Sequence, residues 1–106
     1  MTGEMASIDK HGTDSNGDHW PLHARVARRL RCKLRPFDKY TGPYIAHPAG
    51  KIFLSMDTAW EGTACLWPGG IAPAFRKPLV SAPFAWNDRR AATAAARQVL
   101  KQAAGS

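Results

Sequence analysis

Four histidines and two cysteines are the residues of this chain that could bind a metal ion or act as nucleophiles. His19 and His23 are separated by three residues, so on a helix they would lie one turn apart. Zinc sites are usually recognised by closely spaced ligand pairs such as Cys-x2-Cys, and Cys32 and Cys65 do not form such a pair. We therefore expect no metal site and no cofactor.

The two cysteines are also poor candidates for a catalytic nucleophile. Cys65 lies in an apolar run, where burial raises the pKa of a thiol and makes it inert. Cys32 lies between Arg31 and Lys33, whose charges would favour its thiolate, but a cysteine in an alternating run of this kind is more simply a packing residue. We expect no catalytic residues and no enzymatic activity.

Basic side chains are the most abundant functional groups of this sequence. Lysine and arginine number 15 and aspartate and glutamate 8, which gives a net charge of +7. The excess is concentrated in one part of the chain, because residues 1–20 hold four acidic residues and one lysine, whereas residues 21–106 hold fourteen basic and four acidic residues. A field of this sign attracts phosphates, acidic protein surfaces and anionic lipids.

The basic residues are densest between residues 25 and 39. If residues 28–35 form a strand, alternate cations project from one face about 6.6 Å apart, a spacing similar to that of phosphates along a nucleic-acid strand. Exposed tryptophans on the same surface could stack on unpaired bases. The alternative for each basic row is an ordinary solvated face or a protected edge strand. The predicted binding surface comprises Arg28, Arg29, Arg31, Lys33, Arg35, Arg76, Lys77, Arg90, Arg97, Lys101, Trp60 and Trp67.

Two functions fit such a surface. The first is a small basic nucleic-acid-binding accessory protein that binds DNA before RNA and contacts phosphates through lysine and arginine. The second is a small protein-interaction module, such as an inhibitor or adaptor encoded by a mobile genetic element, that docks its basic and aromatic face on an acidic or nucleic-acid-binding protein. A membrane span is not expected, because no apolar run approaches the ~18 residues that a span needs. Peripheral attachment to anionic membrane is a remote third function, because the predicted helix lacks large apolar anchors.

The element with the clearest signals is a helix near the end of the sequence, in the stretch from residue 87 to residue 105. Asn87 or Asp88 can cap its beginning, and Gly105 suits the position after its end. At about 100° per residue, one side of this helix carries a basic stripe. The other side is mostly alanine and must pack closely against larger side chains; it comprises Ala92, Ala95, Ala96, Val99 and Ala103.

Residues 22–35 fit two patterns. Leucine and valine recur every fourth residue from Leu22 to Leu34, as on a helix, but Leu30, Cys32 and Leu34 alternate with cations, as on a strand. We predict a strand over residues 28–35 and leave a short helix after Pro21 open for the first half.

Two apolar runs, residues 51–56 and 63–67, flank a turn region that contains Gly62 and predict a hairpin. Three prolines between residues 71 and 85 predict an extended connection or an edge strand. Trp86 then directly precedes the predicted helix cap and is placed to pack at the beginning of the helix.

Residues 1–19 show no apolar periodicity and predict a flexible acidic tail, followed by a single basic domain over residues 20–106. The predicted fold class is α+β, with a small antiparallel sheet of two or three strands packed under the C-terminal helix. Because the N-terminus lacks the pattern of a signal peptide, we expect a cytoplasmic protein. The sequence leaves the oligomeric state open.

Overall fold

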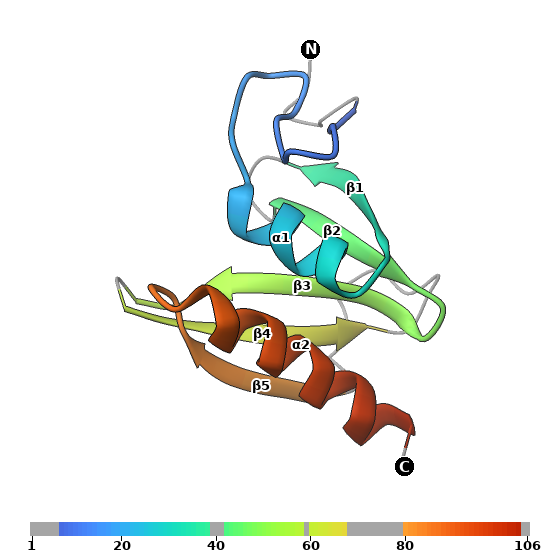
Figure 1. The fold of residues 1–106 in the computed structure, drawn as a ribbon, viewed down its shortest axis with the longest axis vertical. Helices are drawn as coiled ribbons and strands as arrows, with labels where there is room; N and C mark the ends of the chain where they lie inside the picture. Colours follow the sequence, from blue (N-terminus) through green and yellow to red (C-terminus); the bar gives the residue numbers. More distant parts are fainter. Residues whose placement is uncertain (1–6, 39–41, 59, 68–79, 105–106) are drawn as a thin grey trace.

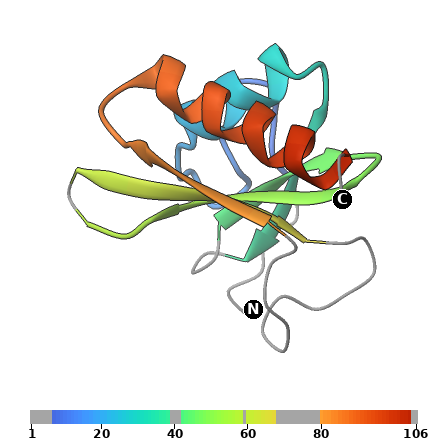
Figure 2. The same cartoon turned by 90° about the horizontal axis from the view of Figure 1, so that it is seen from below.

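The computed structural model describes residues 7–38, 42–58, 60–67 and 80–104, which form a five-stranded antiparallel sheet and two helices (Figure 1). The strands pair in the order of the sequence, and both helices lie on the same face of the sheet (Figure 2). Neither helix is long and apolar enough to cross a bilayer, among the residues described. The elements in order are α1 (Pro21–Arg29), β1 (Lys33–Asp38), β2 (Gly42–His47), β3 (Gly50–Met56), β4 (Glu61–Trp67), β5 (Val80–Ala85) and α2 (Arg89–Ala104).

The α+β class and the C-terminal helix are confirmed, but the sheet has five strands instead of two or three. For the region of β2 the sequence predicts a loop interrupted by prolines and glycines, with a short extended piece at residues 44–46, and the structure extends that piece to a strand of six residues. Pro36 lies where the β1–β2 register shifts between Arg35 and Asp38, and Pro43 lies beside the first residue of β2. Proline is tolerated at such positions because the ladder hydrogen bond is already interrupted there.

The strand predicted over residues 28–35 is wrong in its first half. The helix α1 begins with Pro21, continues to Arg29 and buries His23, Ala24, Val26 and Ala27. Arg31, with φ 57°, turns the chain out of the helix, and β1 begins at Lys33. The apolar residues at every fourth position therefore indicate the correct structure up to Leu30. Only a helix brings the neighbouring residues Val26 and Ala27 together into the core.

The predicted hairpin is confirmed as β3 and β4, with Ile52 opposite Leu66 and Leu54 opposite Ala64. The edge strand predicted near the prolines is present as β5, in which Pro83 is exposed and Ala82 and Phe84 are buried. Residues 71–79 of that predicted segment lie outside the described residues.

The core lies between the sheet and the helices. The predicted alanine face of α2 is buried at Ala92, Ala95, Ala96 and Val99, while Ala103 is partly buried. At the beginning of α2, the carboxylate of Asp88 accepts hydrogen bonds from the backbone N–H groups of Arg90 (3.0 Å) and Ala91 (3.2 Å), so Asp88 is the N-cap. The Trp86 ring stacks on Phe84 with 5.5 Å between the ring centroids.

Residues 7–20 differ from the expected flexible tail, because they form hydrogen-bonded turns. Asp14 is 5% exposed, and its carboxylate accepts hydrogen bonds from the backbone N–H groups of Asn16 and Asp18 and from the indole N–H of Trp20 (2.9 Å). The backbone N–H of Trp20 also donates to the carbonyl of Gly12 (2.7 Å). Aspartate side chains thus accept hydrogen bonds from nearby backbone N–H groups and order this segment. Turns of this kind do not require a periodic apolar pattern, so the pattern of the sequence does not predict them.

Candidate nucleic-acid interface

Five arginines from two helices meet at one end of the helical layer. Because α1 packs beside α2 (Figure 2), basic residues more than sixty positions apart act electrostatically on Arg25. Three come from α1 and two from the first turn of α2. We call this set the arginine cluster: Arg25, Arg28, Arg29, Arg89 and Arg90.

Arg25 is at the centre of the arginine cluster. Its own burial lowers the pKa of its guanidinium, and the neighbouring charges of Arg29, Arg89, Arg28 and Arg90 lower it further. The Nε atom is buried and has no hydrogen-bond partner. Since the neighbouring charges with the largest effect on Arg25 are all positive, a bound anion would relieve their repulsion.

Two open hollows adjoin the arginine cluster, and both include Arg25 and Arg89. The larger, of about 450 Å³, lies at the beginning of α2 and is lined by Arg25, Asn87, Asp88, Arg89 and Arg90. The smaller, of about 300 Å³, lies between the two helices and is lined by Pro21, Leu22, Arg25, Arg28, Trp86 and Arg89. Guanidinium groups around such hollows can donate two parallel hydrogen bonds to one phosphate.

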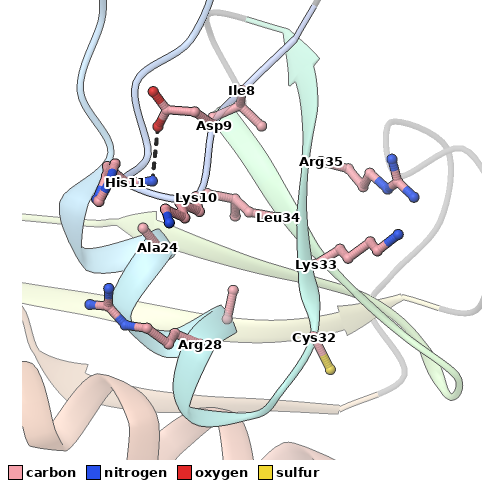
Figure 3. Close-up of a pocket in the computed structure, with 11 residues that line it drawn as sticks. Ile8, Asp9, Lys10, His11, Ala24, Arg28, Cys32, Lys33, Leu34 and Arg35 are labelled. Atoms are coloured by element: carbon pink, nitrogen blue, oxygen red, sulfur yellow. Dashed lines mark hydrogen bonds between the residues drawn. The ribbon is translucent and has the colours of Figure 1, made fainter.

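Lys33 and Arg35 lie on β1 and are not part of the arginine cluster, although they line one pocket with Arg28. Between them Leu34 pairs with Ile45 and packs against the core, so the two cations project from the sheet face that the helices do not cover. Figure 3 shows both side chains directed away from α1. The same face carries Lys51, whose Nζ is 5.1 Å from the centroid of the Tyr44 ring.

A pocket of about 620 Å³ lies between these two basic regions and is lined by residues of both, Arg28 on α1 and Lys33 and Arg35 on β1 (Figure 3). It lies between the N-terminal turns, α1 and β1, and its lining includes the apolar side chains of Ile8, Ala24 and Leu34. Cys32 also lines it; the thiol is free, donates to the carbonyl of Leu30 (3.4 Å), and burial raises its pKa. This thiol is therefore protonated at neutral pH and not activated as a nucleophile.

The predicted binding residues do not form one surface. Arg28, Arg29 and Arg90 come together, whereas Lys33 and Arg35 face the other side and Arg31 lies in the turn after α1. Arg97 and Lys101 are exposed farther along α2, about 10 and 16 Å from Arg90 along the helix axis. Arg76 and Lys77 lie outside the described residues.

Sequence reasoning did not include Arg25 and Arg89 in the predicted surface. Arg25 lies three residues before Arg28 on α1, so the helical pattern, followed to residue 29, would have placed both on one face. Arg89 directly follows the N-cap, which places it at the positive end of α2. That α1 would lie beside this end of α2 could not be predicted, because it depends on how both helices pack on the sheet.

The two tryptophans of the predicted surface differ in exposure and location. Trp67 is half-buried on the sheet face that the helices leave open, directly across from Lys51. Trp60 is 70% exposed in the turn between β3 and β4. Its backbone is fixed, since its N–H donates to the hydroxyl of Thr58 (3.2 Å) and its carbonyl accepts from the N–H of Trp86 (2.8 Å).

The histidines do not assemble a metal site with other ligands. No group of three or more histidine, cysteine, aspartate or glutamate side chains is close enough to hold a metal ion within the described parts of the chain. His19 lies near the hydroxyl of Thr13 (3.1 Å), and His23 is buried with its Nε2 near the carbonyl of Leu54 (3.3 Å). Both histidines thus have partners within the fold.

Comparisons with protein-family models, curated proteins and solved structures found no match to this chain. Its function is therefore inferred from the chemistry of its own surface. The arginine cluster is the feature of that surface with the strongest chemical preference, and the preference is for phosphate.

Proposed function

We propose that this protein is a small nucleic-acid-binding accessory protein, DNA before RNA, that contacts phosphates through the arginine cluster. The observation that carries the proposal is that four arginines from two helices, Arg25, Arg28, Arg89 and Arg90, line two adjoining hollows, and that the charge of Arg29 also acts on Arg25. Four of the five are exposed and can reach a ligand, and Arg25 is half-buried behind them.

Duplex DNA is a suitable ligand because it carries about one negative charge per 1.7 Å of helix axis. Arginine forms two parallel hydrogen bonds to a phosphate and is weakly hydrated, so it loses little on leaving water. The arginine cluster does not present a row of base-reading side chains, so the expected binding positions the protein on the backbone without selecting a sequence.

Fluorescence anisotropy with a labelled 20-base-pair duplex and the corresponding single strand, at 50 and 200 mM salt, tests the proposal. We expect micromolar or tighter dissociation constants at low salt. Because at most five arginines contact phosphate, the slope of log K against log salt should be no steeper than about −4.5. Absence of binding to both ligands at 50 mM salt would refute the proposed function.

A pair of double variants locates the interface. R28A/R90A removes two charges from the arginine cluster and should make the salt slope shallower by about 1.4 to 1.8. K33A/R35A removes the same charge from the other face and is the matched control, for which we expect a nearly unchanged slope. If the two variants weakened binding equally, attraction by net charge alone would explain it, and the proposed interface would be wrong.

A protein-interaction module of the inhibitor or adaptor type, as encoded by mobile genetic elements, is the second candidate function. Exposed apolar side chains at the turn between β3 and β4 favour it, namely Trp60 at 70% and Met56 at 56% exposure. Tryptophan is enriched among residues that contribute most to protein–protein affinity. A partner protein that copurifies after nuclease treatment, and is lost with W60A, would support this function instead.

A further inference from the structure

We infer that the larger hollow beside the arginine cluster is a site for the terminal phosphate of a nucleic-acid end, with Arg25 as its central donor. This inference rests on the proposed function and adds to it a specific ligand group, the 5′-phosphate. The hollow is lined by residues of α1 and of the beginning of α2.

The first argument is the state of Arg25. Its Nε is enclosed by protein and has no hydrogen-bond partner, while the side chain as a whole is half-buried. The donors that a ligand in the hollow can reach are then those at the end of the guanidinium group. A phosphate there supplies acceptors and negative charge at the place where the arginines repel one another.

The second argument is the amount of charge around the hollow. Its lining includes Arg25, Arg89 and Arg90, and one acid, Asp88. The Asp88 carboxylate already caps α2 through two backbone N–H groups, and the formal charges of the three arginines and this one acid sum to +2. A phosphate monoester carries about −1.5 to −2 at pH 7 and matches this charge, whereas a backbone diester carries −1.

The third argument is the shape of the ligand. A terminal phosphate is attached through one oxygen and can enter a hollow with its other oxygens. A backbone diester is attached on both sides, and successive phosphates are better matched by cations in a row. The cations that line the hollow come from two helices, Arg25 from α1 and Arg89 and Arg90 from α2, instead of from one row along a single element.

The test compares two duplexes of one sequence that carry the fluorophore internally, one with 5′-phosphates and one with 5′-hydroxyls. We expect the phosphorylated duplex to bind at least about tenfold more tightly, because one or two charged hydrogen bonds contribute a gain in affinity of this size. Equal affinities of the two duplexes would overturn this inference while leaving the proposed function intact. If neither duplex bound at 50 mM salt, the proposed function itself would have failed.

Variants test whether the preference for the 5′-phosphorylated duplex arises in the hollow. R25Q should reduce the tenfold ratio to nearly one, and R25K, which keeps the charge but not the planar donor pair, should reduce it partly. R97Q removes an exposed charge elsewhere on α2 and should leave the ratio unchanged. Circular dichroism checks the fold of R25Q; should it unfold, R89Q is used in its place. A ratio unaffected by all hollow variants would overturn the inference.

A competition experiment tests whether the hollow binds a phosphorylated protein instead of a phosphorylated nucleic-acid end. A phosphoserine peptide should displace the phosphorylated duplex only at concentrations at least about tenfold higher than an unlabelled phosphorylated duplex, because it lacks the flanking phosphates that the remaining arginines contact. Equal competition by the peptide would show that the hollow recognises phosphoproteins, and the assignment to nucleic-acid ends would be wrong.

Discussion

His23 is a titratable side chain that the fold keeps neutral. It is 2% exposed, and its ring makes edge contacts with Trp20 (5.3 Å between centroids) and Trp86 (6.3 Å). Burial lowers its pKa from 6.5 to about 4, although the nearby Leu54 carbonyl opposes the shift. Protonation of His23 is therefore incompatible with the packing that joins α1 to the beginning of α2.

This burial predicts a loss of stability in weak acid. Between pH 6.5 and 4 the unfolded chain binds a proton at His23 that the folded chain does not, so the free energy of unfolding falls as the pH falls. The total loss is about 3 kcal/mol once the pH is below the folded pKa. Urea denaturation at pH 7, 6, 5 and 4 measures it.

A control separates His23 from the carboxylates. Asp9 and Asp14 have pKa values below the usual 3.8, so their contributions to stability are lost mainly below pH 4. H23Q should therefore remove the dependence between pH 6.5 and 4 and keep the loss at lower pH. A variant with the full dependence of the original chain would show that another group titrates in this range.

Gly62 shows how an element can depend on a missing side chain. It lies in β4 directly across from Phe84, and a Cβ at this position would lie 2.6 Å from the Ser55 carbonyl oxygen and 2.6 Å from the Trp86 ring. Close approach of the strands and the Trp86 ring therefore requires glycine here.

We expect G62A to lower the free energy of unfolding by about 1–3 kcal/mol, as for overpacked sites. S81A, a change at an exposed position of the adjacent strand, serves as the control and should stay within about 0.5 kcal/mol. Thermal or urea denaturation of both variants makes the comparison. An unchanged stability of G62A would mean that Trp86 does not pack on β4 as described.

Elements with local signals were predictable from the sequence, and the remainder depends on tertiary packing. The Asp88 cap and the alanine face specify α2 through local signals, and the apolar runs around Gly62 specify the β3–β4 hairpin. For β2, Pro43 argued against a strand, and the strand forms because β1 and β3 pair with it on both sides. The site divides in the same way: Arg28, Arg29 and Arg90 were predicted, but their meeting with Arg25 and Arg89 depends on how two helices pack.

At the scale of the whole molecule, the segment before α1 is part of the fold. Asp14 connects residues 16, 18 and 20 through its carboxylate, and Trp20 in turn packs on His23. The helical face that carries the arginine cluster and the sheet face with Lys33 and Arg35 are then held on opposite sides of one core.

The ordered segment predicts that D14A destabilises the entire chain. Loss of three accepted hydrogen bonds should lower the melting temperature, by about 4–8 °C for each kcal/mol in a domain of this size. D18A removes an exposed acid from the same segment and should change the melting temperature little. If both variants melted like the original chain, residues 7–19 would behave as the flexible tail that the sequence first suggested.

The order of the strands also bears on how the chain folds during synthesis. Because each strand pairs with the next one in sequence, every hairpin can close as soon as its second strand leaves the ribosome. The first helix is already available to cover β1 and β2, but among the described elements it is α2, translated after β4 and β5, that packs on these two strands. That half of the sheet is therefore exposed to chaperones until about residue 104 has been made, and premature termination before α2 would release an aggregation-prone chain.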